Sequence, residues 1–385
     1  MNSIESKLPH IGTTIFTVMS GLANETGAIN LSQGFPSFEV SRELIELYHQ
    51  AMMNNHNQYA PMAGLLPLRE ALSKKTEKVH GAYYNPESEI TITAGGTQAL
   101  YTAITAFINK GDEVIIFEPA YDSYKPAIEL AGGIVKPYSL TPPDYRINWE
   151  EVKQMITSKT KMIMINTPHN PSGTILTAYD LEQLDAITKD TNIIVLSDEV
   201  YEHIIFDREI HQSVARFENL RNRSVIVYSF GKTFHATGWK TGYCLAPEYL
   251  MKEFRKVHQF LVFSVNTPLQ VALAAYLKNE EHYLNLPSFY QAKRDYFLSL
   301  IEGCSFTFTP CNGSYFQLLD YSSFSNEKDT DLAIRLTKEF GIASIPVSVF
   351  YSSPVDTKML RFCFAKDNVT LEKAAEKIHR IKLKI

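Results

Sequence analysis

Short apolar runs separated by amphipathic segments recur along the middle of the chain. Runs such as "VIIF", "MIMI" and "IIVL" are nearly continuous and partly β-branched, which is typical of strands buried on both faces. Helical patterns lie between several of them. This alternation predicts an α/β domain built on a mostly parallel, seven-stranded sheet. The expected strands are 89–94, 112–119, 133–140, 161–168, 192–200, 224–230 and 242–247.

The C-terminal third has a different pattern, with strand-like segments around a helical stretch at 329–341. It predicts a smaller α+β domain. The N-terminal arm does not fit the parallel sheet, and we expect it to pack on the smaller domain. The strand-like segments are 305–310, 314–320, 343–350 and 359–365. The predicted boundaries are 1–45 for the arm and part of the small domain, 46–280 for the large cofactor-binding domain, and 281–385 for the small domain.

Composition narrows the kind of partner. The 385 residues are 45% hydrophobic and 21% charged, which suits a globular protein of about two domains. A net charge of −5 predicts neither nucleic acid nor an anionic membrane as partner, so small metabolites are favoured. No apolar run approaches the roughly 18 residues of a membrane span. The four cysteines lack metal-site spacing, so we expect reduced thiols, no metal and a cytoplasmic location.

Polar and glycine residues follow several of the predicted strands. The segment Gly95-Gly96-Thr97 comes after the first strand, Asn170 after the fourth, Asp198 ends the fifth, and Lys232 follows the sixth. Functional groups of open α/β sheets gather beyond the carboxyl ends of the strands. We therefore expect these residues to converge on one edge of the sheet.

Each of these residues has an ordinary structural alternative. The glycine turn at 95–97 suits an anion cradle at a helix start, but also a purely structural turn. Asp198 could partner a cationic ring nitrogen or cap a helix. Asn170 could donate to a ligand oxygen or belong to a turn. Arg361 could hold a carboxylate in a bidentate contact or be an edge-strand charge.

Two lysines, Lys232 and Lys240, lie eight residues apart in "SFGKTFHATGWK". A lysine whose pKa is lowered by burial can form a Schiff base with a carbonyl, and the other could pair with a phosphate. Pyridoxal phosphate needs such a lysine, a carboxylate, an anion cradle and donors to its phenolic oxygen. The dinucleotide-binding glycine motif of a dehydrogenase is missing.

Three motifs in order, "NTPHNPSG", "SDEVY" and "SFGKTFHATGWKTGY", resemble those of class I/II aminotransferases of the fold type I pyridoxal-phosphate enzymes. The similarity extends over nearly the whole chain. Other segments, "KLPHIGTTIFTVMS", "APMAGL" and "FSVNTP", are similar to the bacterial methionine aminotransferase group, with kynurenine/glutamine aminotransferases as near relatives.

The resemblance implies a role for each matching residue. Lys232 would bond to the cofactor aldehyde and carry a proton, and Asp198 would pair with the pyridine nitrogen. Tyr201 and Asn170 would donate to the phenolic oxygen, and Asn170 would also reach the substrate carboxylate. The phosphate cup would consist of Gly95, Gly96, Thr97, Ser229 and Lys240. Lysine at position 240 departs from relatives that have arginine there, which leaves the charge but not the bidentate fork.

The remaining implied roles concern the substrate and the partner subunit. Tyr121 would stack on the cofactor ring, and Arg361 would clamp the substrate α-carboxylate, aided by the backbone near Gly34. Phe16 matches a pocket aromatic, although it could instead only anchor the arm in the core. Tyr59 matches a tyrosine lent to the neighbouring subunit, which implies a homodimer with shared active sites.

The implied activity is ping-pong transfer of the amino group of methionine, or of aromatic and other apolar amino acids, to a 2-oxo acid. An apolar cover from the N-terminal arm favours a flexible thioether over a carboxylate. Two alternatives use the same residues, namely a kynurenine/glutamine-type aminotransferase and a cysteine-S-conjugate β-lyase.

Overall fold

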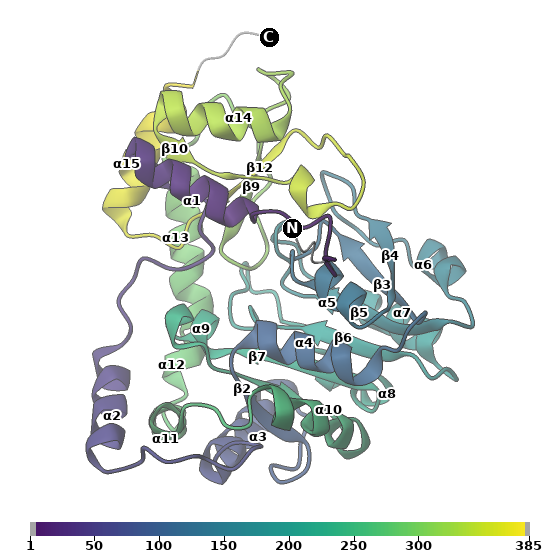
Figure 1. Ribbon diagram of the computed structural model, residues 1–385. Helices are drawn as coiled ribbons and strands as arrows, with labels where there is room; N and C mark the ends of the chain where they lie inside the picture. Colours follow the sequence, from purple (N-terminus) through teal and green to yellow (C-terminus); the bar gives the residue numbers. More distant parts are fainter. Residues whose placement is uncertain (1–4, 382–385) are drawn as a thin grey trace.

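The computed structural model describes residues 5–381, and its centre is a seven-stranded sheet (Figure 1). The strand order is β2-β8-β7-β6-β5-β3-β4. Only β8 runs opposite to the other six strands, so the prediction of a mostly parallel seven-stranded sheet is confirmed. The strands are β2 (Ile90–Thr93), β3 (Glu113–Glu118), β4 (Ile134–Ser139), β5 (Thr160–Asn166), β6 (Ile194–Asp198), β7 (Ser224–Ser229) and β8 (Gly242–Leu245).

Apolar side chains cover both faces of this sheet. In β5, Met162 and Met164 belong to a buried cluster with side chains of α4, α5 and α10, while Ile163 and Ile165 belong to the cluster on the other face. Successive residues of a strand point to opposite faces, so both must be apolar here. The flanking helices include α3 (Leu66–His80), α4 (Gly96–Phe107), α5 (Tyr124–Leu130), α6 (Trp149–Met155), α7 (Ala178–Thr188), α8 (Glu218–Arg221), α10 (Glu248–Leu261) and α11 (Thr267–Tyr276).

A smaller antiparallel sheet with the order β11-β12-β9 lies towards the C-terminus. The N-terminal segment joins this region, because β1 pairs with β10 and α1 lies beside them (Figure 1). The domain boundaries at 45 and 280 stay predictions, and residues 1–4 and 382–385 of those domains lie outside the described residues. The elements are α1 (Ile15–Thr26), β1 (Ile29–Asn30), α2 (Arg42–Met53), α12 (Glu281–Leu284), α13 (Leu286–Leu300), β9 (Phe316–Asp320), α14 (Asp329–Arg335), the π-helix η3 (Leu336–Phe340), β10 (Ile342–Ala343), β11 (Ile345–Pro346), β12 (Met359–Cys363) and α15 (Asn368–His379).

Two predicted strands of the small domain differ from the structure. The segment 305–310 forms no strand, and only Thr307 makes a bridge, to Asp320 at the end of β9. The segment 343–350 contributes the end of β10 and the two-residue β11, and then turns into the 3-10 helix η4 (Ser348–Phe350). Pro310 and Pro346 lack the N–H that a longer ladder needs, which limits pairing at both places.

Candidate active site

The carboxyl ends of β2, β5, β6 and β7 open onto a cavity of about 290 Å³. The small domain and the N-terminal segment supply its other walls. The convergence expected from the strand ends is therefore present. The sequence-predicted residues that line this cavity are Phe16, Gly34, Gly95, Gly96, Thr97, Tyr121, Asn170, Asp198, Tyr201, Ser229, Lys232, Lys240 and Arg361.

Lys232 follows β7 in the short helix α9 (Phe230–Thr233). Its Nζ donates to the carbonyl oxygen of Gly34 at 2.8 Å and to the hydroxyl of Tyr315 at 3.0 Å. Burial lowers the pKa of Lys232 to about 8, because an ammonium is poorly solvated there. Lys232 therefore becomes a neutral amine, which can act as nucleophile or base, at a lower pH than a lysine in water does.

Asp198 is the last residue of β6 and is 5% exposed. Its carboxylate accepts from the Tyr124 hydroxyl at 2.6 Å and from the N–H of Val200 at 3.3 Å. Burial raises the pKa of Asp198 to about 6, although the hydrogen bonds from Tyr124 and Val200 act in the opposite direction. A turn, not a helix, follows Asp198, so the helix-cap alternative does not apply.

Arg361 lies in β12 and is 1% exposed. Its Nη1 donates to Oδ1 of Asn170 at 2.7 Å, and its Nη2 to the Ser32 carbonyl at 3.0 Å. Burial lowers the pKa of Arg361 to about 10. Its Nε is buried without a partner, and no carboxylate of residues 5–381 forms an ion pair with it. Arg361 is therefore a cavity cation, not an exposed edge charge.

The glycine turn brings small backbone groups next to a cation. Gly95 has φ +86°, and α4 begins at Gly96. A Cβ on Gly95 would lie 3.6 Å from Nζ of Lys240, an ordinary contact distance, so it is the positive φ that favours glycine at this position. The hydroxyls of Thr97 and Tyr121 are 3.5 Å apart. Helix-start N–H groups, a hydroxyl and an ammonium are suitable partners for an anion.

Aromatic rings complete the cavity wall. The Tyr201 ring meets the Tyr315 ring edge-on, with centroids 5.1 Å apart, and the Phe316 ring with centroids 6.0 Å apart. Phe16 lies 5.2 Å from the Arg361 guanidinium carbon. It lines the cavity and also packs against the core, and its role as a pocket aromatic stays a prediction.

Tyr59 is not part of this cavity. Its side chain is 81% exposed, and its ring meets Phe263 edge-on with centroids 5.2 Å apart. A contribution of Tyr59 to a neighbouring subunit stays a prediction.

Sequence reasoning missed three polar residues of the site. Asn166 ends β5 directly opposite Asp198 and donates from Nδ2 to the Asp198 carbonyl at 2.9 Å. The strand-end rule that selected Asp198 could have found Asn166. Tyr124 lies three residues after Tyr121, on the first turn of α5. Tyr315 carries no local signal, because its contacts are with residues far away in the sequence.

Two further features of residues 5–381 concern membranes and metals. No helix in that range is long and apolar enough to cross a membrane. No group of three or more His, Cys, Asp or Glu side chains in that range is arranged to hold a metal ion. The cytoplasmic location stays a prediction.

The carboxyl edge of a mostly parallel α/β sheet carries Lys232 and Asp198 here, and Arg361 of the small sheet faces them across the cavity. Such an arrangement is typical of a group-transfer enzyme. Residues 26–378 match the family model for aminotransferase class I and II. The chain therefore belongs to that family, and the predictions of the family, the fold class and a transaminase are confirmed.

Individual aminotransferases are similar to this chain over nearly its whole length. Methionine aminotransferase of Escherichia coli is 50% identical over 98% of both chains. Human kynurenine–oxoglutarate transaminase 1 is 33% identical over 94% of both chains. A crystal structure of an Escherichia coli protein with a methionine aminotransferase function has a TM-score of 0.97, with 50% identity, 99% of this chain and 100% of that chain covered. N-succinyldiaminopimelate aminotransferase of Mycobacterium tuberculosis has a TM-score of 0.94 at 32% identity, covering 98% and 99%.

Proposed function

We propose that this protein is a pyridoxal-phosphate-dependent aminotransferase that moves the amino group of methionine, or of aromatic and other apolar amino acids, to a 2-oxo acid. The observation that carries the proposal is one cavity lined by three ionisable groups, the half-buried Lys232 and the buried Asp198 and Arg361, each with a pKa shifted by burial. None of them forms an ion pair within residues 5–381. The 50% identity to a methionine aminotransferase supports the donor class.

The residues present fit pyridoxal phosphate. Lys232 offers an amine of lowered pKa, and Asp198 offers a carboxyl that lacks a cationic partner. A protonated ring nitrogen beside Asp198 would restore the carboxylate, because an opposite charge favours the ionised form. The turn at Gly95 and the ammonium of Lys240 suit the phosphate. The rest of the cavity is lined by Tyr121, Asn170, Tyr201, Thr97 and Ser229.

Pyridoxal phosphate, when bound, supplies an aldehyde for the amino group and a conjugated ring that accepts electrons from the α-carbon. Arg361 would bind the substrate α-carboxylate through its free N–H groups and so orient the α-carbon. Lys232 would take up the proton of the α-carbon and return it at the neighbouring position. Asp198 would hold positive charge on the ring. Donor and acceptor react in turn, which gives ping-pong kinetics.

The cavity walls favour an apolar side chain on the donor. The cations that line the cavity in the described chain are Lys232, Lys240 and Arg361, and each already has a proposed partner. Among residues 5–381, no further cation lines the cavity to bind a second substrate carboxylate. Phe16 offers an apolar contact instead, which suits the flexible thioether of methionine.

Steady-state kinetics with several donors test this function. We expect kcat/KM for methionine and aromatic donors to exceed that for aspartate by at least about 10-fold, the effect of one apolar contact. Phe16→Ala should weaken methionine more than alanine as donor. An equal or higher kcat/KM with aspartate contradicts the proposed preference. Product that forms without any 2-oxo acid, together with pyruvate and ammonia from a cysteine conjugate, would instead indicate a β-lyase.

We also propose a homodimer in which Tyr59 of one copy completes the phosphate site of the other. The support is the family likeness and the exposure of Tyr59 beside other exposed apolar residues, such as Phe263 at 49%. Mixing Lys232→Ala protein with Tyr59→Phe protein should restore activity through heterodimers that contain one unaltered site. A fully active monomer in sedimentation experiments excludes shared sites.

A further inference from the structure

Tyr315 forms a hydrogen-bonded triangle with Lys232 and Gly34. The Tyr315 hydroxyl donates to the Gly34 carbonyl at 2.7 Å, and Lys232 Nζ donates to the same carbonyl at 2.8 Å and to the Tyr315 hydroxyl at 3.0 Å. The three residues come from three separate parts of the chain: the N-terminal segment, α9 and the residue before β9. The triangle therefore exists only in the folded protein.

The Tyr315 side chain is held firmly in its place. It is fully buried, its ring meets those of Tyr201 and Phe316 with centroids 5.1 Å and 4.9 Å away, and its backbone carbonyl accepts from Phe364 at 3.1 Å. Burial holds the pKa of Tyr315 well above its ordinary value. The hydroxyl thus stays protonated, and since it donates to Gly34, it offers a lone pair to Lys232.

We propose that Tyr315 is a positioning residue for Lys232, which aims the lysine amine at the substrate α-carbon. The inference rests on the proposed aminotransferase function. A neutral amine has two N–H bonds and one lone pair. The Gly34 carbonyl and the Tyr315 hydroxyl accept the two N–H bonds, which leaves the lone pair for the cavity that Lys232 lines.

The proton transfer balances without any additional group. The α-carbon C–H bond breaks, the proton joins the lone pair of Lys232 as a third N–H, and the electron pair stays with the substrate and its conjugated system. The new N–H occupies the direction of the former lone pair, so it faces the atoms that receive the proton next. The two contacts to Gly34 and Tyr315 are unchanged throughout.

Kinetics of Tyr315→Phe test the proposal, with Tyr290→Phe as matched control. The Tyr290 ring lies 5.9 Å from that of Tyr315, but its buried hydroxyl has no partner among the described residues. With methionine as donor, we expect Tyr315→Phe to lower kcat about 10-fold or more while KM is kept, because misplacing a general base costs rate. The kinetic isotope effect with α-deuterated methionine should be at least as large as in the wild type. An unchanged kcat, or a loss shared by Tyr290→Phe, overturns the proposal, as does a smaller isotope effect.

A second readout needs no turnover. In the cofactor-free protein, the pH dependence of Lys232 modification by trinitrobenzenesulfonate, read by peptide mass spectrometry, reports the pKa of its amine. Tyr315→Phe should lower that pKa by about one unit, because the ammonium loses a hydrogen bond. Tyr290→Phe should leave it unchanged. Equal pKa values in wild type and Tyr315→Phe contradict the positioning role.

A structure of the wild-type enzyme keeps the proposal testable even if Tyr315→Phe does not fold. Crystals with pyridoxal phosphate and α-methylmethionine, which has no α-proton to lose, should show the freed Lys232 Nζ within hydrogen-bond distance of Gly34 and Tyr315. An amine turned away from both overturns the proposal. Wild-type protein inactive with every amino donor defeats the proposed function itself, whereas active wild type with an unaffected Tyr315→Phe defeats only this inference.

Discussion

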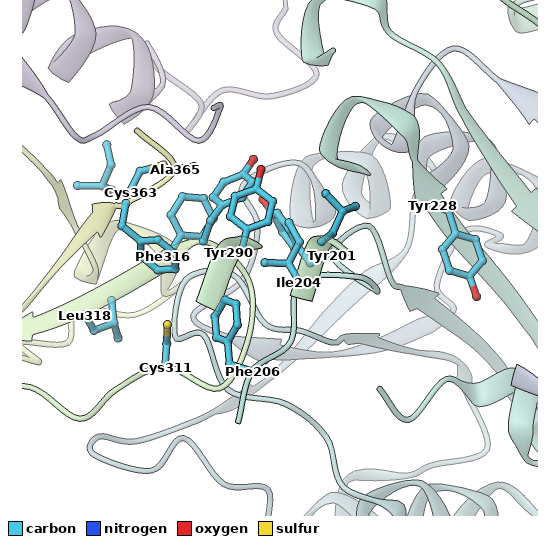
Figure 2. Packing of buried hydrophobic residues seen from close by; sticks show 14 of the residues in the cluster. Tyr201, Ile204, Phe206, Tyr228, Tyr290, Cys311, Phe316, Leu318, Cys363 and Ala365 are labelled. Atoms are coloured by element: carbon cyan, nitrogen blue, oxygen red, sulfur yellow. The ribbon is translucent and has the colours of Figure 1, made fainter. Parts of the chain in front are cut away.

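The end of β6 and the turn after it, residues 198–203, carry buried acidic side chains that lie in two different electrostatic environments. Asp198 and Tyr201 face the cavity, and Glu199 and Glu202 point into the protein interior behind it. Figure 2 shows Tyr228, which donates to Glu199, well apart from Tyr201. Adjacent residues, Asp198 and Glu199, thus lie in two different electrostatic environments.

Behind the cavity, each carboxylate has its own basic partner. Glu202 forms an ion pair with buried Lys75 and a 3.1 Å contact with His80. Burial alone would raise the pKa of Glu202, but Lys75 and the histidines outweigh it, and the pKa lies well below its ordinary value. Glu199 lies 2.9 Å from Nε2 of His211. The cost of burying these carboxylates is offset within the chain.

On the cavity side that compensation is missing. Asp198 has neutral partners and a pKa raised to about 6, and Arg361 has no carboxylate partner in the described chain. The paired charges behind the cavity stabilise the fold, whereas the unpaired ones that line it are suited to bind a charged ligand.

Lys232→Ala should remove measurable turnover, a loss of at least about 10⁴-fold, because both the amine and the proton carrier are lost. The phosphate contacts remain, so the variant should still bind cofactor. Lys256→Ala, an exposed position on α10, serves as control and should be fully active. Substantial turnover in Lys232→Ala, measured by 2-oxo acid formation, would show that the cavity lysine is not the reactive group.

Glu202→Gln should destabilise the cofactor-free protein by about 3–5 kcal/mol, because Lys75 is left buried without its partner. The matched control is Glu253→Gln, whose ion pair with Lys256 is exposed and should be worth at most about 1 kcal/mol. Urea denaturation at neutral pH measures both. Equal losses in the two variants would remove the structural role assigned to the interior carboxylates.

Asp198→Asn should lower kcat by about 10²- to 10³-fold, the usual cost of losing a key electrostatic partner at a reacting centre. The side chain keeps its size, so the fold should be retained. Near-normal kcat with methionine would mean that the Asp198 carboxylate has another role.

The same substitution should stabilise the cofactor-free protein, opposite in sign to Glu202→Gln. The folded pKa of about 6 exceeds the ordinary 3.8, so the folded state holds its proton more tightly, and wild-type stability falls as pH rises from about 4 to 6. Above pH 6 the penalty is complete, and Asp198→Asn should gain up to about 3 kcal/mol. The gain should vanish below pH 4. Thermal unfolding of both proteins from pH 4 to 8 measures it, and a gain that does not depend on pH would contradict burial of a charged Asp198.

Much of this arrangement could be predicted from the sequence. The strands of the large sheet are continuous apolar runs, and the residues at their carboxyl ends, such as Asp198 and Lys232, could be selected by position alone. The direction in which a side chain faces could not be predicted. The pattern around Arg361 allowed the side chain to face either solvent or the cavity, and in the structure it is buried in β12. Tyr315 was missed because its function depends on a triangle across three distant segments, for which a single sequence holds no local signal.

The proposal that Lys232 bonds to the cofactor is tested most directly by borohydride reduction of the cofactor-loaded protein, followed by peptide mass spectrometry. Borohydride converts a lysine–cofactor bond into a stable secondary amine, which marks the lysine that carried it. We expect the mark on Lys232, the cavity amine whose pKa is lowered. A mark on Lys240, or on no lysine of the cavity, would contradict the proposal.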